Sequence, residues 1–287
     1  MSETTVRDSF VTLSDVDFET LAAFIESRLG IKMPITKRKL LEARLQKRLR
    51  HYGLRSFRDY TDLLFRSEDS YQEVMNFIDE VTTNKTDFFR EPDHFRRLEE
   101  LLRNGSMRGR SGPLRLWSVA SSSGEEPYTM AMICEERHRL DQSFSYEITG
   151  TDISYKMLKT AVRGVYLGEL IKPVPDVLRK RYLLRGTGDH AGTFRVVPQI
   201  RNRVSFYRLN LMDGSYGIKQ GFDVVFCRNV LIYFDGERQR AIMRKIHALL
   251  NPGGYLFMGP TEGMLASFLP LEKVSNNLFR RPEESYA

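Results

Sequence analysis

The stretch "LWSVASSSGEEPYTM" (Leu116–Met130) combines an apolar run, a serine-rich turn and the start of a helix. Nucleotide-binding proteins place a glycine-rich phosphate loop at such a point, between the first strand and its helix. Here the turn contains one glycine, Gly124, followed by two carboxylates, Glu125 and Glu126. A glutamate would repel a pyrophosphate, and the sequence has neither a GxGxxG fingerprint nor a P-loop. The turn therefore predicts a ligand other than a dinucleotide.

Apolar runs and helical segments alternate along the chain after Leu114. The runs are "LRLWSVA", "YEITGTDI", "VSFYRLNL", "FDVVFCRNV" and "GYLFMGP", and the helical segments cover 127–138, 154–162 and 236–250. This alternation predicts an α/β fold, a mostly parallel sheet with helices on both faces. Between Val165 and Val204, "RYLLRGTGDHAGTFRVVPQI" contains two short strand-like runs around a glycine-rich turn, which predict a small antiparallel excursion.

The first third of the chain has the pattern of short helices. Ser14, with Asp17 three residues later, predicts one helix start, and Gly30 predicts its end. Thr36 is expected to cap the next helix, which stops at Gly53. We expect an all-helical N-terminal domain over 1–82 and a second domain over 83–287, with the antiparallel insertion at about 165–203.

Positive charge is concentrated in this helical third. The formal net charge of the chain is +7, and the segment Lys32–Arg58 holds ten Lys or Arg against one acid, Glu42. Charge of this density is typical of contacts with nucleic acid, membrane headgroups or an acidic protein. Arg44, Lys47 and Arg48 lie away from the apolar stripe of their helix, and we predict that they dock the partner.

The composition is that of an ordinary globular protein, with 41% hydrophobic and 28% charged residues. No apolar run approaches the ~20 residues that span a bilayer, and the first residues lack the pattern of a secretory signal. Cys134 and Cys227 stand outside any CxxC or Cys/His cluster, which argues against a disulfide framework and a zinc site. We expect a cytoplasmic, monomeric protein that is not a membrane protein and holds no metal.

Three segments are expected at the carboxyl edge of the sheet, where ligands of doubly wound folds bind. Pro127 suits the first helical position, so Glu126 is predicted at the N-cap, facing the ligand. Asp152 ends the second strand, where an acid typically binds ribose hydroxyls, and the fourth strand delivers Arg228 and Asn229. S-Adenosylmethionine (SAM) fits these groups because it has a ribose and two cationic groups but no phosphate. Each segment also has a simpler interpretation. The glutamate at the helix start can be a helix cap, Asp152 can be a turn-forming aspartate, and Arg228 and Asn229 can belong to a surface turn.

Five motifs in this chain resemble those of the CheR-type chemotaxis receptor methyltransferases. They are "VTTNKTDFFRE" (81–91), "WSVASSSGEEPY" (117–128), "GTDIS" (150–154), "FYRLNL" (206–211) and "FDVVFCRNVLIYF" (222–234). The resemblance runs through the whole chain in the same order. It implies a Rossmann-like SAM-dependent methyltransferase domain with a small antiparallel β-subdomain, preceded by a small all-helical domain.

The resemblance also implies an activity and a set of contacts. The activity is transfer of a methyl group from SAM to glutamate side chains of chemoreceptor cytoplasmic signalling helices, which leaves S-adenosylhomocysteine and glutamate methyl esters. By position, the cofactor contacts are Asn84, Thr86, Arg90, a glutamate of the GEE pair (assigned to Glu126), Asp152, Asn210, Leu211, Arg228 and Asn229. The stretch "GPTEG" (259–263) departs from the Gly-His-Ser-Glu of many members, so no role of that histidine is transferred.

The chemistry agrees with the residues present. A glutamate acceptor has a pKa of ~4.3, so it is ionised at neutral pH and needs no general base. What remains is to position the acceptor carboxylate. Arg90 and Tyr233 are the predicted catalytic donors, and the two phenylalanines before Arg90 are expected to anchor it.

Two other functions fit part of the sequence. A nucleic-acid methyltransferase would use the basic segment for phosphates, but the chain lacks an Asn/Asp-Pro-Pro-aromatic loop, and Tyr52 and Phe57 are the only aromatics of that segment. We expect no nucleic-acid partner. A non-catalytic SAM-binding adaptor is the second alternative, and the presence of Arg90 and Tyr233 argues against it.

The antiparallel excursion predicts a further contact. An open strand edge invites a peptide to add as a strand, and Arg181, Arg185 and Arg195 would attract an acidic one. Its glycine-rich loop resembles that of family members which bind a receptor C-terminal tail peptide. We therefore predict such a tether here.

Overall fold

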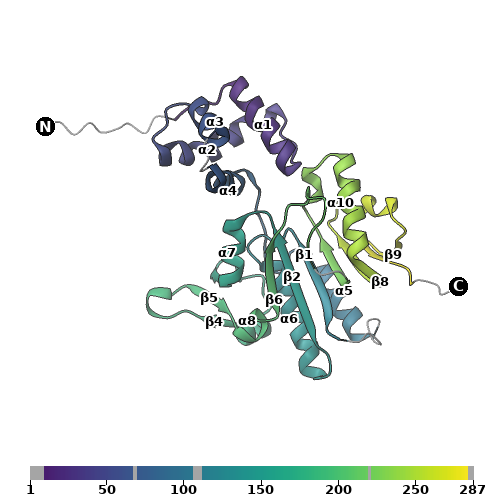
Figure 1. Cartoon of the computed structure of the whole chain (residues 1–287). Coiled ribbons are helices and arrows are strands. Elements are labelled where there is room, and N and C mark those ends of the chain that lie inside the picture. The colour runs from purple at the N-terminus through teal and green to yellow at the C-terminus, as the bar shows by residue number, and fades with distance from the viewer. Residues whose placement is uncertain (1–9, 67–69, 106–111, 219–220, 284–287) are drawn as a thin grey trace. The chain divides into compact units, whose positions relative to one another are not determined.

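The computed structural model describes residues 10–66, 70–105, 112–218 and 221–283. The chain divides into two compact units, residues 1–83 and 84–287. The first unit is helical and contains α1 (Asp15–Leu29), the 3-10 turn η1 (Ile35–Lys37), α2 (Arg38–Tyr52), α3 (Phe57–Arg66) and α4 (Ser70–Val81) (Figure 1).

The helix limits of the first unit follow local chemistry. Ser14 caps α1 by accepting a hydrogen bond from the N–H of Asp17, and Gly30 ends it with a φ of 70°. The prediction that Thr36 caps the next helix is wrong. The chain after Pro34 enters a 3-10 turn that contains Thr36 and continues directly into α2, so no side chain caps that helix. The stripe of Leu41, Leu45 and Leu49 is buried as expected.

The second unit contains a seven-stranded sheet in the order β6-β2-β1-β7-β8-β10-β9. Its strands are β1 (Leu114–Val119), β2 (Tyr146–Asp152), β6 (Val204–Arg208), β7 (Phe222–Cys227), β8 (Leu250–Met258), β9 (Glu272–Ser275) and β10 (Leu278–Arg280). The first five strands in this order pair in parallel, and β10 pairs antiparallel with both β8 and β9. The predicted α/β fold with a mostly parallel sheet is confirmed.

Helices cover both faces of this sheet. They are α5 (Pro92–Arg103), α6 (Glu125–Leu140), α7 (Tyr155–Arg163) and α10 (Gly236–Leu249), with the 3-10 turns η3 (Leu231–Tyr233) and η4 (Gly263–Phe268) in the later loops. Alternate residues of β7 enter two different cores. Val224 and Phe226 pack in the core that includes α5 and α6, whereas Val225 and Cys227 pack in the core that includes α10. Cys134 and Cys227 are both free and buried, and burial raises the pKa of each thiol.

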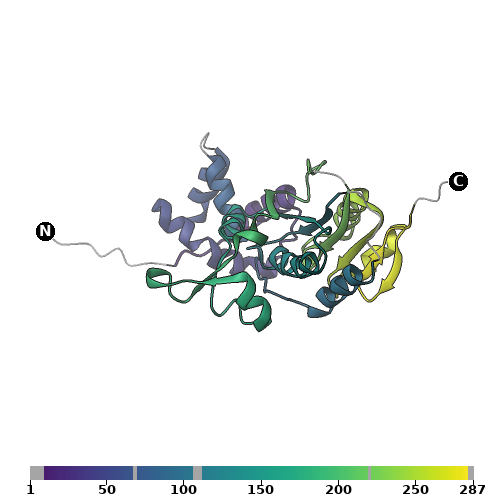
Figure 2. The same ribbon diagram turned by 90° about the horizontal axis from the view of Figure 1, so that it is seen from below.

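The antiparallel excursion is larger than the sequence predicts. Besides the expected hairpin of β4 (Leu183–Arg185) and β5 (Thr193–Val196), it contains β3 (Val165–Leu167), the helices α8 (Asp176–Tyr182) and α9 (Pro198–Arg201) and the turn η2 (Gly188–His190). The strand order is β3-β5-β4, with antiparallel pairing throughout. Both views show the hairpin of β4 and β5 extending away from the large sheet (Figure 1, Figure 2). None of the described helices is long and apolar enough to cross a membrane.

Candidate functional site

The carboxyl ends of β2, β1 and β7 lie side by side, because these parallel strands are neighbours in the sheet. The strand order reverses between β1 and β7, which is the switch point where doubly wound folds bind their ligands. Asp152 is the last residue of β2, Glu126 lies in the first turn of α6 after β1, and Arg228 directly follows β7. The segment after the helical unit reaches the same edge, since the Ser122 hydroxyl donates to the carbonyl oxygen of Asn84 at 2.9 Å.

The turn after β1 is built from left-handed backbone. Ala120, Ser122 and Gly124 have φ values of 54°, 49° and 96°. This conformation aims the Ser122 N–H at the Asp152 Oδ2 atom, 2.8 Å away, while the Ser154 N–H donates to the Oδ1 atom at 2.8 Å. The buried Asp152 carboxylate is therefore held in a fixed orientation by two backbone groups at the predicted ribose site.

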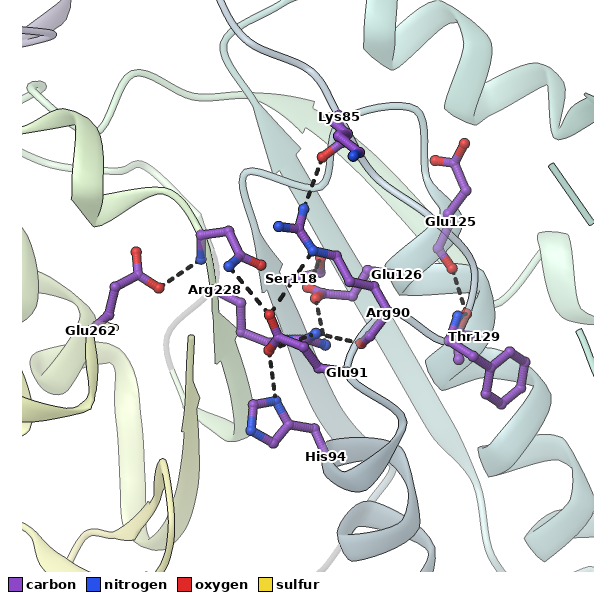
Figure 3. Close-up of polar contacts among 12 residues, drawn as sticks. Lys85, Arg90, Glu91, His94, Ser118, Glu125, Glu126, Thr129, Arg228 and Glu262 are labelled. Carbon is purple, nitrogen blue, oxygen red and sulfur yellow. Dashed lines mark hydrogen bonds and ion pairs between the residues drawn. The ribbon is translucent and has the colours of Figure 1, made fainter. Parts of the chain in front are cut away.

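The prediction that Glu126 is the N-cap of its helix is wrong. Gly124 is the cap, and its left-handed φ turns the chain into α6 at Glu125, ahead of Pro127. Successive residues of a helix point about 100° apart. The Glu125 carboxylate accepts from the Ser123 hydroxyl at 2.9 and 2.8 Å. It points away from the side chains around Arg228, whereas Glu126 points toward Ser118 and Arg228 (Figure 3).

Glu126 belongs to a buried polar cluster at the end of β1. Its carboxylate accepts from the Ser118 hydroxyl at 2.7 Å and lies 3.1 Å from the Nη1 atom of Arg228. Burial raises the pKa of Glu126, and the Arg228 charge opposes that shift. Of the GEE pair, Glu126 is the carboxylate that reaches the switch point.

Arg228 is the centre of this cluster, with 2% of its side chain exposed. Its Nη2 atom lies 3.0 Å from the Oε2 atom of Glu91 and donates to the carbonyl oxygen of Arg90. The rings of Phe95 and Phe226 flank the guanidinium, with centroids 5.3 and 5.7 Å from its carbon. Arg228 therefore joins β7, α6 and the segment before α5. Its predicted contact with the cofactor stays a prediction.

The segment that contains Arg90 is anchored and strained. Phe88 is buried and Phe89 packs against Phe95, as expected for the two phenylalanines before Arg90. Phe89 and Glu91 have φ values of 54° and 58°, a conformation that costs energy in residues other than glycine. The half-buried Arg90 side chain donates to the carbonyl oxygen of Lys85 at 3.0 Å.

The loop after β7 presents the other predicted residues. Asn229 has a φ of 56°, and its Nδ2 atom donates to Glu91 at 3.3 Å. Tyr233 lies at the end of η3, half-buried against the α10 core, and the structure gives it no polar contact with the Arg228 cluster. Asn210 and Leu211 follow β6, and Thr86 lies between Asn84 and Arg90.

Four residues of the site have no local signal in the sequence: Ser118, Glu91, His94 and Glu262. The His94 Nδ1 atom lies 3.5 Å from Glu91, and burial together with the Arg228 charge lowers the pKa of His94 to about 4. Glu262 is 1% exposed and accepts hydrogen bonds from the backbone of the loop after β7. Burial raises the pKa of Glu262, and these N–H groups oppose the shift.

The predicted docking residues of α2 make contacts within the helical unit. Arg48 binds Glu73 through two of its nitrogens, Arg44 donates to the carbonyl oxygens of Val81 and Thr82, and Lys47 pairs with Glu80. The Arg48 side chain is 14% exposed and that of Lys47 is 49% exposed. Of the three, Lys47 is the residue most open to a partner.

Two family models match this chain. Residues 84–277 match the CheR methyltransferase SAM-binding domain, and residues 16–82 match the CheR methyltransferase all-alpha domain.

Among the described residues, no group of three or more His, Cys, Asp or Glu is arranged to hold a metal.

Curated relatives are similar over most of their length. The chemotaxis protein methyltransferase of Klebsiella aerogenes is 37% identical over 274 residues, which cover 96% of this chain and 90% of the relative. That of Escherichia coli K12 is 39% identical over 252 residues, 88% and 86% of the two chains. Chemotaxis protein methyltransferase 2 of Pseudomonas aeruginosa is 39% identical over 250 residues, 87% of each chain. The chain therefore belongs to the CheR methyltransferase family and is a SAM-dependent protein methyltransferase.

Proposed function

We propose that this methyltransferase transfers the methyl group of SAM to glutamate carboxylates on chemoreceptor cytoplasmic helices, giving glutamate methyl esters. The observation that carries the proposal is the meeting of the Glu126 and Asp152 carboxylates with the Arg90 segment at the switch point of the sheet. The relatives are named chemotaxis protein methyltransferases, which is consistent with this substrate class.

The donor set of the site fits SAM. Two carboxylates would repel a phosphate, but they suit a ligand with ribose hydroxyls and cationic groups. We assign the ribose hydroxyls to Asp152 and the cationic amino-acid part to the region of Glu126, with Asn84, Thr86, Asn210, Leu211 and Asn229 as further contacts. When bound, SAM supplies a methyl group on a positively charged sulfur, which the acceptor carboxylate takes with loss of both charges.

The residues of this chain then have to orient the acceptor and exclude water. The acceptor is ionised at neutral pH, so the absence of a paired general base fits the reaction. A site that strips water from both charges favours their neutralisation. We assign the orientation of the acceptor carboxylate to the Arg90 guanidinium and the Tyr233 hydroxyl, because both side chains are half-buried and able to donate.

Docking is assigned to the all-helical domain and to the β-subdomain. The exposed side of α2, with Lys47, would attract the acidic substrate helix, whereas Arg44 and Arg48 support the helix itself. The exposed Arg185 and Arg195 on neighbouring strands of the β-subdomain would attract a receptor C-terminal tail. Titration of a tail peptide into the protein and into a variant lacking Gly188–Gly192 tests this tether. No binding to the intact protein contradicts it.

The main test is methylation with SAM labelled in its methyl group. Separate incubations contain a receptor cytoplasmic fragment, tRNA or no acceptor. We expect label on the receptor fragment that mild alkali releases as methanol, because carboxyl esters hydrolyse and methylated amines do not. Label on tRNA, or alkali-stable label on the receptor, contradicts the proposal. Asp152→Asn serves as the cofactor-binding control and should lose label on the receptor.

A further inference from the structure

Glu262 is a buried acid whose carboxylate is bound by backbone groups alone. Its Oε2 atom accepts from the Asn229 N–H at 2.6 Å, and its Oε1 atom accepts from the N–H groups of Val230 and Leu231 at 2.9 and 2.7 Å. Its side chain makes no ion pair with a Lys, Arg or His within the described residues. A buried charge without a counterion is stable only when several hydrogen-bond donors converge on it. The three backbone N–H groups therefore compensate for the burial of the Glu262 carboxylate.

The loop after β7 needs such an acceptor. Asn229 is in left-handed conformation with a φ of 56°, and η3 begins two residues later. The first N–H groups of a helical turn have no partner inside the turn. Here Glu262 supplies that partner to three successive residues from outside the loop. Without it, the loop would combine unsatisfied buried donors with a strained backbone.

The chain makes room for this carboxylate through a glycine. A Cβ atom at Gly259 would lie 2.1 Å from the Oε2 atom of Glu262 and 2.9 Å from the backbone nitrogen of Asn229. The turn that follows β8 thus brings Glu262 against the loop that follows β7, its parallel neighbour. The bent "GPTEG" turn is complementary to the loop after β7, and its glycine is required for the contact.

The loop held by Glu262 carries the residues assigned to the reaction. It begins beside Arg228, includes Asn229 and ends at Tyr233. The Asn229 side chain reaches Glu91, so its backbone is fixed by one carboxylate and its amide by another. We propose that Glu262 is a positioning residue for methyl transfer, which sets the backbone conformation of the loop from Asn229 to Tyr233. This inference rests on the proposed function of those two residues.

The test compares Glu262→Gln with the exposed control Glu272→Gln on β9. Glutamine has the same shape, but it removes the charge and turns an amide group toward backbone donors. We expect kcat to fall about a hundredfold, the cost of misplacing reacting groups by about 1 Å, with an unchanged KM for the receptor fragment. The amide protons of Asn229, Val230 and Leu231, shifted downfield by the carboxylate in the wild type, should move upfield. The control should change neither quantity.

A second variant separates positioning from folding. Gly259→Ala leaves Glu262 in the chain but pushes its carboxylate away from the loop, so the same fall in kcat and the same amide shifts are expected. All measurements are made where circular dichroism shows the variants folded. Unchanged amide shifts, or an unchanged kcat per folded molecule, overturn the inference.

Failure of the proposed function has a different signature. If the wild type methylates no receptor fragment, the proposed function fails. The amide shifts and the affinity for S-adenosylhomocysteine then still decide the role of Glu262. Calorimetry should show affinity weakened about tenfold in Glu262→Gln, the cost of one misplaced hydrogen bond to the ligand. Equal affinity together with unchanged amide shifts overturns the inference independently of activity.

Discussion

Two arginines, the partly buried Arg48 in the helical unit and the buried Arg228 at the sheet edge, are held by carboxylates in different ways. The partner of Arg48, Glu73, also accepts from the Tyr60, Tyr52 and Asn76 side chains at 2.6, 3.0 and 3.3 Å. Every oxygen of that acid has a partner.

The Arg228 cluster is less complete. Among the described residues, the Nη1 atom of Arg228 and the Nδ1 atom of His94 lie 3.1 and 3.5 Å from the carboxylates of Glu126 and Glu91 but make no hydrogen bond. Glu91 and Asn229 beside them have positive φ values. Networks that are fully satisfied rigidify a fold, whereas unpaired groups and backbone strain gather at functional sites. We infer from this difference that Arg48 serves the structure of its unit, and we predict that a ligand completes the site around Arg228.

The largest effect is expected at Arg48. Arg48→Met should lower the free energy of unfolding by about 3–5 kcal/mol, because it leaves Glu73 buried without its counterion. Affinity for S-adenosylhomocysteine should not change. Urea denaturation and calorimetry measure the two quantities. Adding Glu73→Leu should restore part of the stability, and full stability of the single variant would show that the pair is not structural.

Replacement of Arg228 should lower activity more than it lowers stability, the reverse of the pattern expected for Arg48. Arg228→Met releases Glu91, Glu126 and the Arg90 carbonyl, so kcat/KM should fall about a hundredfold, or about 2.7 kcal/mol. Arg97→Met, at an exposed position of α5, is the matched control. Steady-state kinetics with a receptor fragment decides the outcome. If Arg228→Met kept its activity but lost much of its stability, both arginines would be structural and the proposed difference between them would be wrong.

A pH effect of intermediate size is expected from His94. Its pKa is lowered to about 4 in the folded protein, below its ordinary value of 6.5, so the unfolded chain takes up a proton first as pH falls. The contribution of neutral His94 to stability is complete above pH 6.5 and is lost progressively toward pH 4. Between pH 7 and pH 5 the loss is about 2 kcal/mol.

Replacement of His94 tests that assignment. His94→Gln should flatten the acid side of the curve of unfolding free energy against pH, whereas His51→Gln, at an exposed position of α2, should leave it unchanged. If the curves of unfolding free energy against pH were equal for His94→Gln and the wild type, His94 would not cause the loss of stability in acid.

The smallest effect is expected at Lys47, one residue before Arg48. Its pair with Glu80, in which the lysine is about half exposed, should contribute about 1 kcal/mol or less to stability. Lys47→Glu should instead raise the KM for a receptor fragment, and added salt should have the same effect because exposed charges are screened over ~8–10 Å. Salt-independent methylation would contradict docking through α2.

The sequence predicts the fold well where periodicity is long. Five parallel strands and their helices follow from apolar runs, and the glycine-rich turn marks β4 and β5. The strands β3, β9 and β10 also have only three or four residues each, but the sequence offers no comparable turn signal for them. Strand ends also predict that Asp152, Glu126 and Arg228 lie at the same edge of the sheet. Their partners are not predictable locally, because Glu91 and Arg228 are 137 residues apart and Glu262 and Asn229 are 33 apart. The stretch "GPTEG" indicates a turn after a strand. It does not indicate that Glu262 faces the loop after β7.

The burial of both cysteines has a practical consequence. Thiol reagents attack the thiolate, and neither Cys134 nor Cys227 presents one to solvent in the folded chain. These are the two cysteines of the sequence. A cysteine introduced at exposed Leu184 of the β4–β5 hairpin would therefore react selectively with a fluorescent maleimide. The wild-type sequence is thus a ready background for a single-dye reporter of receptor capture, with no cysteine to remove first.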